Sequence, residues 1–171
     1  MVTAVLLLSG CKVSLSTPRV IYLDGAGWYS SAGSVSAGLR SGGYRGAFER
    51  FNWSSLLGVG ADHFVASRSG LNARRLARRI QAIHEADPGG PLHLIGLSAG
   101  TLVVLRALEA LPEEVSVDRV VLLSSSVSAG FDLSEALPHV RGRIYATCSP
   151  YDRILSSLAV SADGRTGKTV G

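Results

Sequence analysis

The chain of 171 residues has little that would hold a metal, bind nucleic acid or cross a membrane. Its two cysteines, Cys11 and Cys148, lack the spacing of a metal site, and no cluster of His, Cys and Asp at ligand spacing occurs elsewhere. Aromatic residues make up 6%, a low share for a platform that stacks bases. The apolar run 4–8 is too short to span a bilayer. These absences disfavour metalloproteins, nucleic-acid-binding proteins and transmembrane proteins.

The composition is that of one globular domain with a real core. Hydrophobic residues make up 46% of the chain and charged residues 18%. The net charge of +4 and the pI near 9.4 could indicate an anionic partner. However, Arg74, Arg75, Arg78 and Arg79 fall at the spacing of one helix face, without interleaved aromatics. We therefore predict a solvated outer face and no nucleic-acid partner.

The first 17 residues permit two interpretations. The apolar run 4–8 ends in small residues, as in a signal peptide, and Leu8-Ser9-Gly10-Cys11 resembles the lipobox of bacterial lipoproteins. That resemblance implies that residues 1–17 are a signal and a tether, that Cys11 is lipidated, and that the chain is anchored to a membrane in the cell envelope. No Lys or Arg precedes the apolar run, which departs from the usual signal. The alternative is a first strand with Cys11 as a small buried residue, in a cytoplasmic protein.

From residue 18 onward, strand-like and helix-like segments alternate. Strands are expected at Pro18–Leu23, Ala47–Trp53 (near the sheet edge), the run before Gly96, Val117–Ser124 and Gly142–Cys148; helices at Ser34–Arg40, Ala73–Ala86 with Asn72 as its N-cap, the run after Gly100, and Phe131–Val140. This alternation predicts an α/β fold over residues 18–171: a doubly wound, mostly parallel sheet with helices on both faces and no lid domain.

The segment around Ser98 organises the rest of the chain. Gly96-x-Ser98-x-Gly100 lies between an apolar strand-like run and an Ala/Leu-rich helix-like run, which is the context of a nucleophile elbow. A strand that turns directly into a helix forces the serine into a strained backbone conformation, and only very small residues fit two positions before and after it. The alternative is a Gly/Ser turn without chemistry.

Two other strand ends carry candidate site residues. The turn Asp24-Gly25-Ala26-Gly27 follows the first strand, where backbone N–H groups could form an oxyanion hole. Asp152 follows the strand Gly142–Cys148, where an acid could orient a histidine, although a helix-capping role is the common one for such a residue. The first turn also has some likeness to a nucleotide-binding loop, but it lacks the third glycine at the right spacing.

In order and motif, residues 18–155 resemble the α/β-hydrolase family. The resemblance implies that Ser98 is the nucleophile, that the N–H groups of Ala99 and Ala26 stabilise the oxyanion, and that Asp152 is the acid of a triad. Asp24 stands where the family has a histidine, a departure that affects the second oxyanion donor. The implied activity is hydrolysis of a small-molecule carboxylic ester or thioester, without a cofactor.

The general base is missing from the expected place. The family order is Ser, then Asp or Glu, then His, but no histidine follows Asp152. His63, His84, His93 and His139 all precede it, and none occupies the position of a base. We expect either a chain cut short before a downstream histidine or a non-catalytic, α/β-hydrolase-like envelope protein that binds a small or acyl ligand. The first reading is favoured, because the elbow and acid would otherwise have little purpose.

Overall fold

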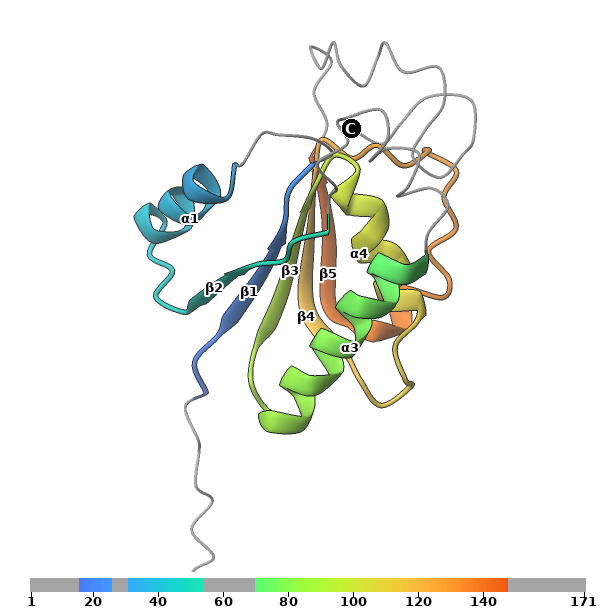
Figure 1. Ribbon diagram of the computed structural model, residues 1–171, viewed down its shortest axis with the longest axis horizontal. Coiled ribbons are helices and arrows are strands. Elements are labelled where there is room, and N and C mark those ends of the chain that lie inside the picture. The colour runs from blue at the N-terminus through green and yellow to red at the C-terminus, as the bar shows by residue number, and fades with distance from the viewer. Residues whose placement is uncertain (1–15, 26–30, 54–69, 148–171) are drawn as a thin grey trace, which may run out of the picture.

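The computed structural model describes residues 16–25, 31–53 and 70–147. Within these ranges the elements alternate along the chain (Figure 1), and their bounds are β1 Arg19–Leu23, α1 Ala32–Ser41, β2 Ala47–Arg50, α3 Gly70–Ala86, β3 Leu92–Leu97, α4 Gly100–Glu109, β4 Val117–Leu123, the 3-10 helix η1 Leu137–His139, and β5 Val140–Thr147. The strands form one sheet in the order β2-β1-β3-β4-β5, and every pairing in it is parallel. The predicted α/β class and parallel sheet are confirmed.

Helices cover both faces of the sheet (Figure 1). On one face, α1 places Val35 and Leu39 against a small cluster around Val20 and Tyr22 of β1. On the other face, α3 and α4 cover the larger core. Its fully buried side chains include Ile21 and Leu23 of β1, Leu94 of β3, Leu76 and Ile80 of α3, and Leu102, Leu105 and Leu108 of α4. Because the buried strands carry apolar residues on both faces, they have near-continuous apolar sequences, which made them recognisable.

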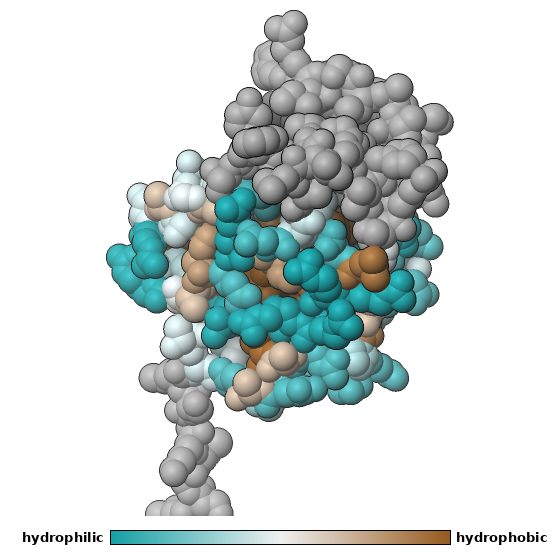
Figure 2. All heavy atoms as spheres, viewed as in Figure 1, coloured by the Kyte–Doolittle hydropathy of each residue, from teal (hydrophilic) through white to brown (hydrophobic). Residues whose placement is uncertain are grey.

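The outward face of α3 is polar (Figure 2). Its four arginines, at positions 74, 75, 78 and 79, are exposed, whereas Leu76 and Ile80 are buried beneath them. This amphipathic pattern is what the spacing predicted. Arg79 also forms a two-pronged hydrogen bond to Glu49 of β2, at 2.8 and 2.7 Å.

Two predicted helix boundaries are wrong. α3 begins at Gly70, so Asn72 lies inside the helix rather than capping it; its amide donates to the Trp53 carbonyl at 3.0 Å. The helix expected over 131–140 is reduced to η1, because the Asp132 carboxylate accepts the Ser134 N–H at 2.9 Å in a local turn. Such a side-chain bond competes with helix formation.

Candidate functional site

Ser98 has the backbone geometry of a nucleophile elbow. It follows the last residue of β3 and precedes α4, and its φ is +50°, in the left-handed region that costs a non-glycine residue free energy. Its N–H donates to the Leu123 carbonyl of β4 at 2.9 Å, which fixes the turn to the neighbouring strand. The strand-to-helix context predicted from the sequence is confirmed.

The two glycines of the motif are required by close backbone packing. A Cβ on Gly96 would lie 3.0 Å from the Thr101 Cα and 3.1 Å from the Gly100 carbonyl carbon. A Cβ on Gly100 would lie 2.6 Å from the Asp24 carbonyl oxygen and 3.0 Å from that of Leu23. Position 100 therefore leaves no room for a side chain, and position 96 is tightly packed, which is the steric reason expected for the motif.

Ser98 lies at the point where the strand order of the sheet reverses, between β1 and β3. The chain leaves β1 toward β2 at one edge, and it leaves β3 toward β4 and β5 at the other. The carboxyl ends of β1 and β3 are adjacent, with Leu23 opposite Gly96 in the register. In open parallel sheets, ligands bind in the crevice outside the strand ends at such a switch point. The sheet topology alone thus directs attention to Ser98 and to the residues after Leu23.

The backbone that follows β1 contacts the elbow directly. A Cβ built on Gly25 would lie 3.2 Å from the Ser98 Cβ. The segment that leaves β1 therefore passes beside the nucleophile candidate, as an oxyanion loop must. Ala26, the predicted second oxyanion donor, lies just outside the described residues, and its role stays a prediction.

The first predicted oxyanion donor is Ala99, at the start of α4. Ala99 is fully buried, and within the described ranges its N–H donates to no backbone carbonyl. This N–H stands at the positive end of α4, where a negative charge is favoured. This environment suits a donor that is kept for a negative charge on a substrate.

Asp24 anchors the segment beside the elbow. Its Oδ1 accepts hydrogen bonds from the Ser31 N–H and the Ser31 hydroxyl, both at 2.9 Å, and from the Tyr22 hydroxyl at 3.1 Å. Its Oδ2 is paired with the Arg50 Nε at 2.8 Å, and its backbone carbonyl accepts the Trp53 indole N–H at 2.8 Å. Sequence reasoning had assigned no role to this buried carboxylate, because Ser31 and Arg50 reach it only in the folded chain.

The Asp24 network has one strong electrostatic consequence. Burial, with the Asp24 carboxylate nearby, raises the pKa of Tyr22 to about 12, although its hydrogen bond with Ser31 acts in the opposite direction. Tyr22 is completely buried, so its phenol stays protonated and serves as a donor. These groups hold the end of β1 in place rather than supplying a general base.

The described histidines lie at the edge of the sheet opposite Ser98. His93 is the second residue of β3, and His139 directly precedes β5, so both are at the amino ends of strands. His84 lies in the last turn of α3, whose end is likewise followed by the start of β3. None of these three can act on Ser98. His63 and the predicted acid Asp152 lie outside the described residues.

His93 and His139 have structural environments. Burial lowers the pKa of His93, with nearby Asp118 acting in the opposite direction, and its Nδ1 is buried without a partner among the described residues. The Nδ1 of His139 is 2.8 Å from the Val115 carbonyl. Both positions agree with the prediction that these histidines are not the base.

The serines that follow β4 contribute to the structure around the elbow. Ser124 has a φ of +42° and, with Ser98, is one of two non-glycine residues in the described ranges with a positive φ. Ser125 is fully buried and its hydroxyl donates to the Thr101 Oγ1 at 3.2 Å, directly behind the elbow. A serine run carries no sequence signal for such a contact, because the partner is 24 residues away.

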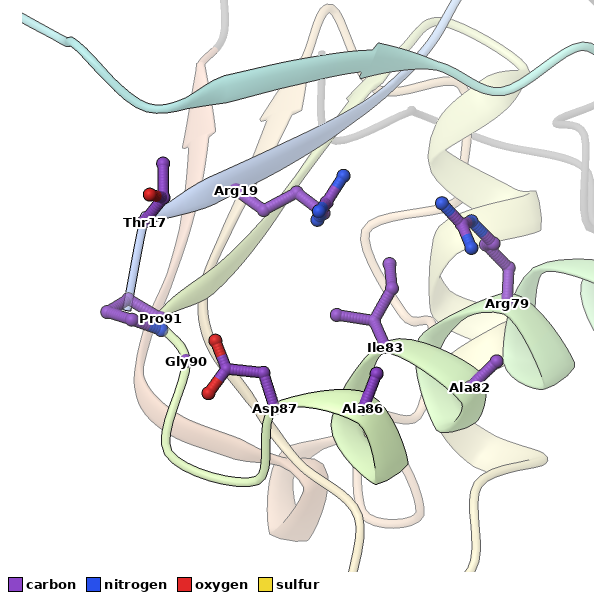
Figure 3. A pocket seen from close by; sticks show the side chains of 9 residues that line it. All are labelled: Thr17, Arg19, Arg79, Ala82, Ile83, Ala86, Asp87, Gly90 and Pro91. Atoms are coloured by element: carbon purple, nitrogen blue, oxygen red, sulfur yellow. The ribbon is translucent and has the colours of Figure 1, made fainter. Parts of the chain in front are cut away.

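A cavity of about 150 Å³ lies between the amino ends of β1 and β3 and the last turns of α3 (Figure 3). It is bounded by Arg19 at the start of β1, by Arg79, Ile83 and Asp87 of α3 and its exit, and by Pro91. Both arginines are paired with Glu49, and the Asp87 carboxylate accepts the Ser16 hydroxyl at 2.9 Å. Both arginines that bound the cavity are therefore ion-paired, and the Asp87 carboxylate is hydrogen-bonded.

The described ranges contain no group of three or more His, Cys, Asp or Glu side chains that could hold a metal. They also contain no helix long and apolar enough to cross a membrane. Cys11, the predicted lipidation site, is outside them, so the envelope anchor stays a prediction.

Solved structures with a similar architecture include a cutinase and an acetylxylan esterase. A Trichoderma reesei cutinase, solved with a phosphonate inhibitor, aligns with a TM-score of 0.58 at 18% identity, covering 85% of this chain and 71% of that one. An acetylxylan esterase aligns with a TM-score of 0.55 at 17% identity, covering 87% and 90%. The fold is α/β-hydrolase-like.

A cutinase-like protein from Cryptococcus sp. supports the same conclusion, with a TM-score of 0.51 at 17% identity over 75% of this chain and 76% of that one. No protein-family model and no curated protein matches the sequence. At these identities the likeness establishes the α/β-hydrolase-like fold, and the chemistry must be argued from the residues of this chain.

Proposed function

We propose that this α/β-hydrolase-like chain is a serine hydrolase that cleaves a carboxylic ester or thioester through an acyl-enzyme on Ser98. The observation that carries this is the left-handed backbone of Ser98 between two glycines that pack tightly against backbone atoms, at the switch point of the sheet. A strained residue persists only where the surrounding structure enforces it. The esterase neighbours support this choice of reaction.

The reaction follows from the parts around Ser98. Its hydroxyl oxygen attacks the substrate carbonyl while a base takes the proton, and the Ala99 N–H stabilises the oxyanion that forms. The leaving alcohol or thiol departs with a proton returned by the base, and water then releases the acid from Ser98. In this scheme Ala26 supplies the second oxyanion donor and Asp152 orients the base.

The base must lie outside the described residues, since His84, His93 and His139 are at the wrong edge of the sheet. That placement is also the observation that favours the second candidate, a non-catalytic protein that binds a small or acyl ligand in the same crevice. The two candidates differ in whether the Ser98 hydroxyl is activated.

Labelling with a fluorophosphonate probe, followed by intact-mass measurement, tests the activation of Ser98. A base within the 171 residues predicts one adduct on the unmodified chain and none on Ser98→Ala. Ser124→Ala is the matched control, because Ser124 also has a positive φ at the end of an adjacent strand; it should keep the adduct. Labelling of Ser98→Ala equal to that of the unmodified chain would refute the hydrolase proposal.

An unlabelled chain that still binds an acyl ligand would support the non-catalytic candidate. A labelled chain would require a base within these residues, and His63→Gln then becomes the decisive variant, since His63 is the one histidine whose position is not described. Loss of labelling in that variant would identify the base.

A further inference from the structure

The carbonyl group of Ser98 is held by two hydrogen bonds from one residue. The Thr101 N–H donates to it at 3.0 Å and the Thr101 hydroxyl donates to it at 2.5 Å. The Thr101 hydroxyl in turn accepts from the Ser125 hydroxyl at 3.2 Å. Thr101 and Ser125 are both fully buried, so these bonds do not compete with bulk water.

This chain of hydroxyls controls the peptide group that joins Ser98 to Ala99. A trans peptide is planar, so its C=O and its N–H point in opposite directions. Fixing the Ser98 carbonyl toward Thr101 therefore fixes the Ala99 N–H on the other side of the same plane. Hydrogen bonds to the carbonyl also polarise the peptide, which makes its N–H a stronger donor.

The backbone of Ser98 needs such support. A φ of +50° is costly for serine, and a strained turn relaxes unless neighbouring bonds hold it. The bond from the Ser98 N–H to the Leu123 carbonyl holds one side of the residue, and the bonds from Thr101 hold the other. Ser125 follows Leu123 by two positions, so the loop after β4 secures both sides.

We propose that Thr101 and Ser125 are positioning residues for the proposed hydrolysis: their buried hydroxyls orient and polarise the Ser98–Ala99 peptide so that the Ala99 N–H is aimed at the oxyanion. The inference rests on the proposed function of Ser98. It assigns a role in the transition state, because the oxyanion charge is fully developed only there. Neither residue touches the substrate.

Steady-state hydrolysis of p-nitrophenyl butyrate tests the role of Thr101. Thr101→Val should lower kcat by about 10- to 100-fold and change KM by less than about 2-fold. This fall in kcat does not exceed the one expected when an entire oxyanion donor is removed. Thr101→Ser keeps the hydroxyl and should stay within about 3-fold of the unmodified kcat. A purely structural role would not give a loss confined to kcat and restored by serine.

Ser125→Ala tests the more distant hydroxyl without altering the elbow, and it decides the matter if Thr101→Val does not fold. Its kcat should fall about 3- to 10-fold at unchanged KM, because the polarising bond to Thr101 is lost while the bond to Ser98 remains. Ser126→Ala is the matched control. Its hydroxyl is equally buried and has no partner among the described residues, so kcat should not change.

The outcomes separate the two proposals. If Ser98→Ala abolishes turnover while Ser125→Ala and folded Thr101→Val behave like Ser126→Ala, the positioning role is refuted and the hydrolase stands. A rise in KM at constant kcat refutes it as well. If the unmodified chain does not hydrolyse the ester, the proposed function fails and the positioning role fails with it.

Discussion

At the scale of single residues, the site depends on positions where no side chain fits. Gly100 begins α4, yet its role is not helix flexibility, because the place of its missing Cβ is occupied by the backbone carbonyls of Leu23 and Asp24. The carbonyls belong to the end of β1, which passes beside Ser98. The close approach of β1 to the elbow is therefore possible only with glycine at position 100.

Gly100→Ala should destabilise the fold by about 2 kcal/mol or more, because an added Cβ at 2.6 Å from a backbone oxygen forces β1 and α4 apart. The matched control is Gly33→Ala in α1, where an added Cβ meets nothing within 4 Å. There alanine should stabilise the helix by about 0.5–1 kcal/mol through its higher propensity. Urea denaturation of both variants measures the difference, and equal stabilities would contradict the packing explanation.

At the scale of elements, the buried network around Asp24 joins the end of β1 to α1 and β2. Tyr22 lies in β1, Ser31 precedes α1, and Arg50 ends β2. Their polar groups converge on one carboxylate, so the three elements are fixed together next to the elbow. Satisfied buried networks of this kind specify one arrangement of the backbone.

Alkaline pH should weaken this network through Tyr22. Its pKa is raised to about 12 in the folded chain, against about 10 when unfolded, so its stabilising effect is complete below pH 10 and is lost as the pH rises through 12. The loss should be on the order of 2 kcal/mol. Thermal melting between pH 9 and 12 measures it.

Tyr22→Phe should remove that alkaline loss and should cost about 1 kcal/mol at neutral pH, because the hydroxyl bonds to Asp24 and Ser31 are absent. Tyr145→Phe is the matched control, since that ring is 46% exposed. An alkaline stability curve of Tyr22→Phe identical to that of the unmodified chain would show that Tyr22 does not titrate as described.

At the scale of the whole molecule, the sequence predicted what is encoded locally. The apolar strands, the amphipathic pattern of α3 and the elbow glycines each depend on neighbours in sequence, and all were recognised. The Asp24 network and the Thr101–Ser125 contact were not, because their partners meet only after the sheet has formed. The same cause explains the misplaced cap: Asn72 bonds to the Trp53 carbonyl, 19 residues earlier. Ala26, Asp152 and Cys11 stay predictions.

His93, at the edge of the sheet opposite Ser98, should make the free energy of unfolding fall in mild acid. His93 is neutral in the fold because burial lowers its pKa, while nearby Asp118 raises it and Arg119 and Arg141 lower it. The unfolded chain therefore binds a proton more readily. Stability contributed by neutral His93 is complete above pH ~6.5 and is lost as the pH falls below that value.

Urea denaturation between pH 7.5 and 5 should show this loss, with a slope of at most about 1.4 kcal/mol per pH unit. Hydrogen bonds from Arg79 lower the pKa of Glu49. Burial alone would raise the pKa of Asp118, but the bonds from Arg141 and the Leu92 N–H outweigh it, so the net pKa of Asp118 is lowered. Their contributions are therefore lost only at lower pH, outside this window. His93→Gln should flatten the curve; a curve that stays steep in His93→Gln would assign the acid sensitivity to other groups.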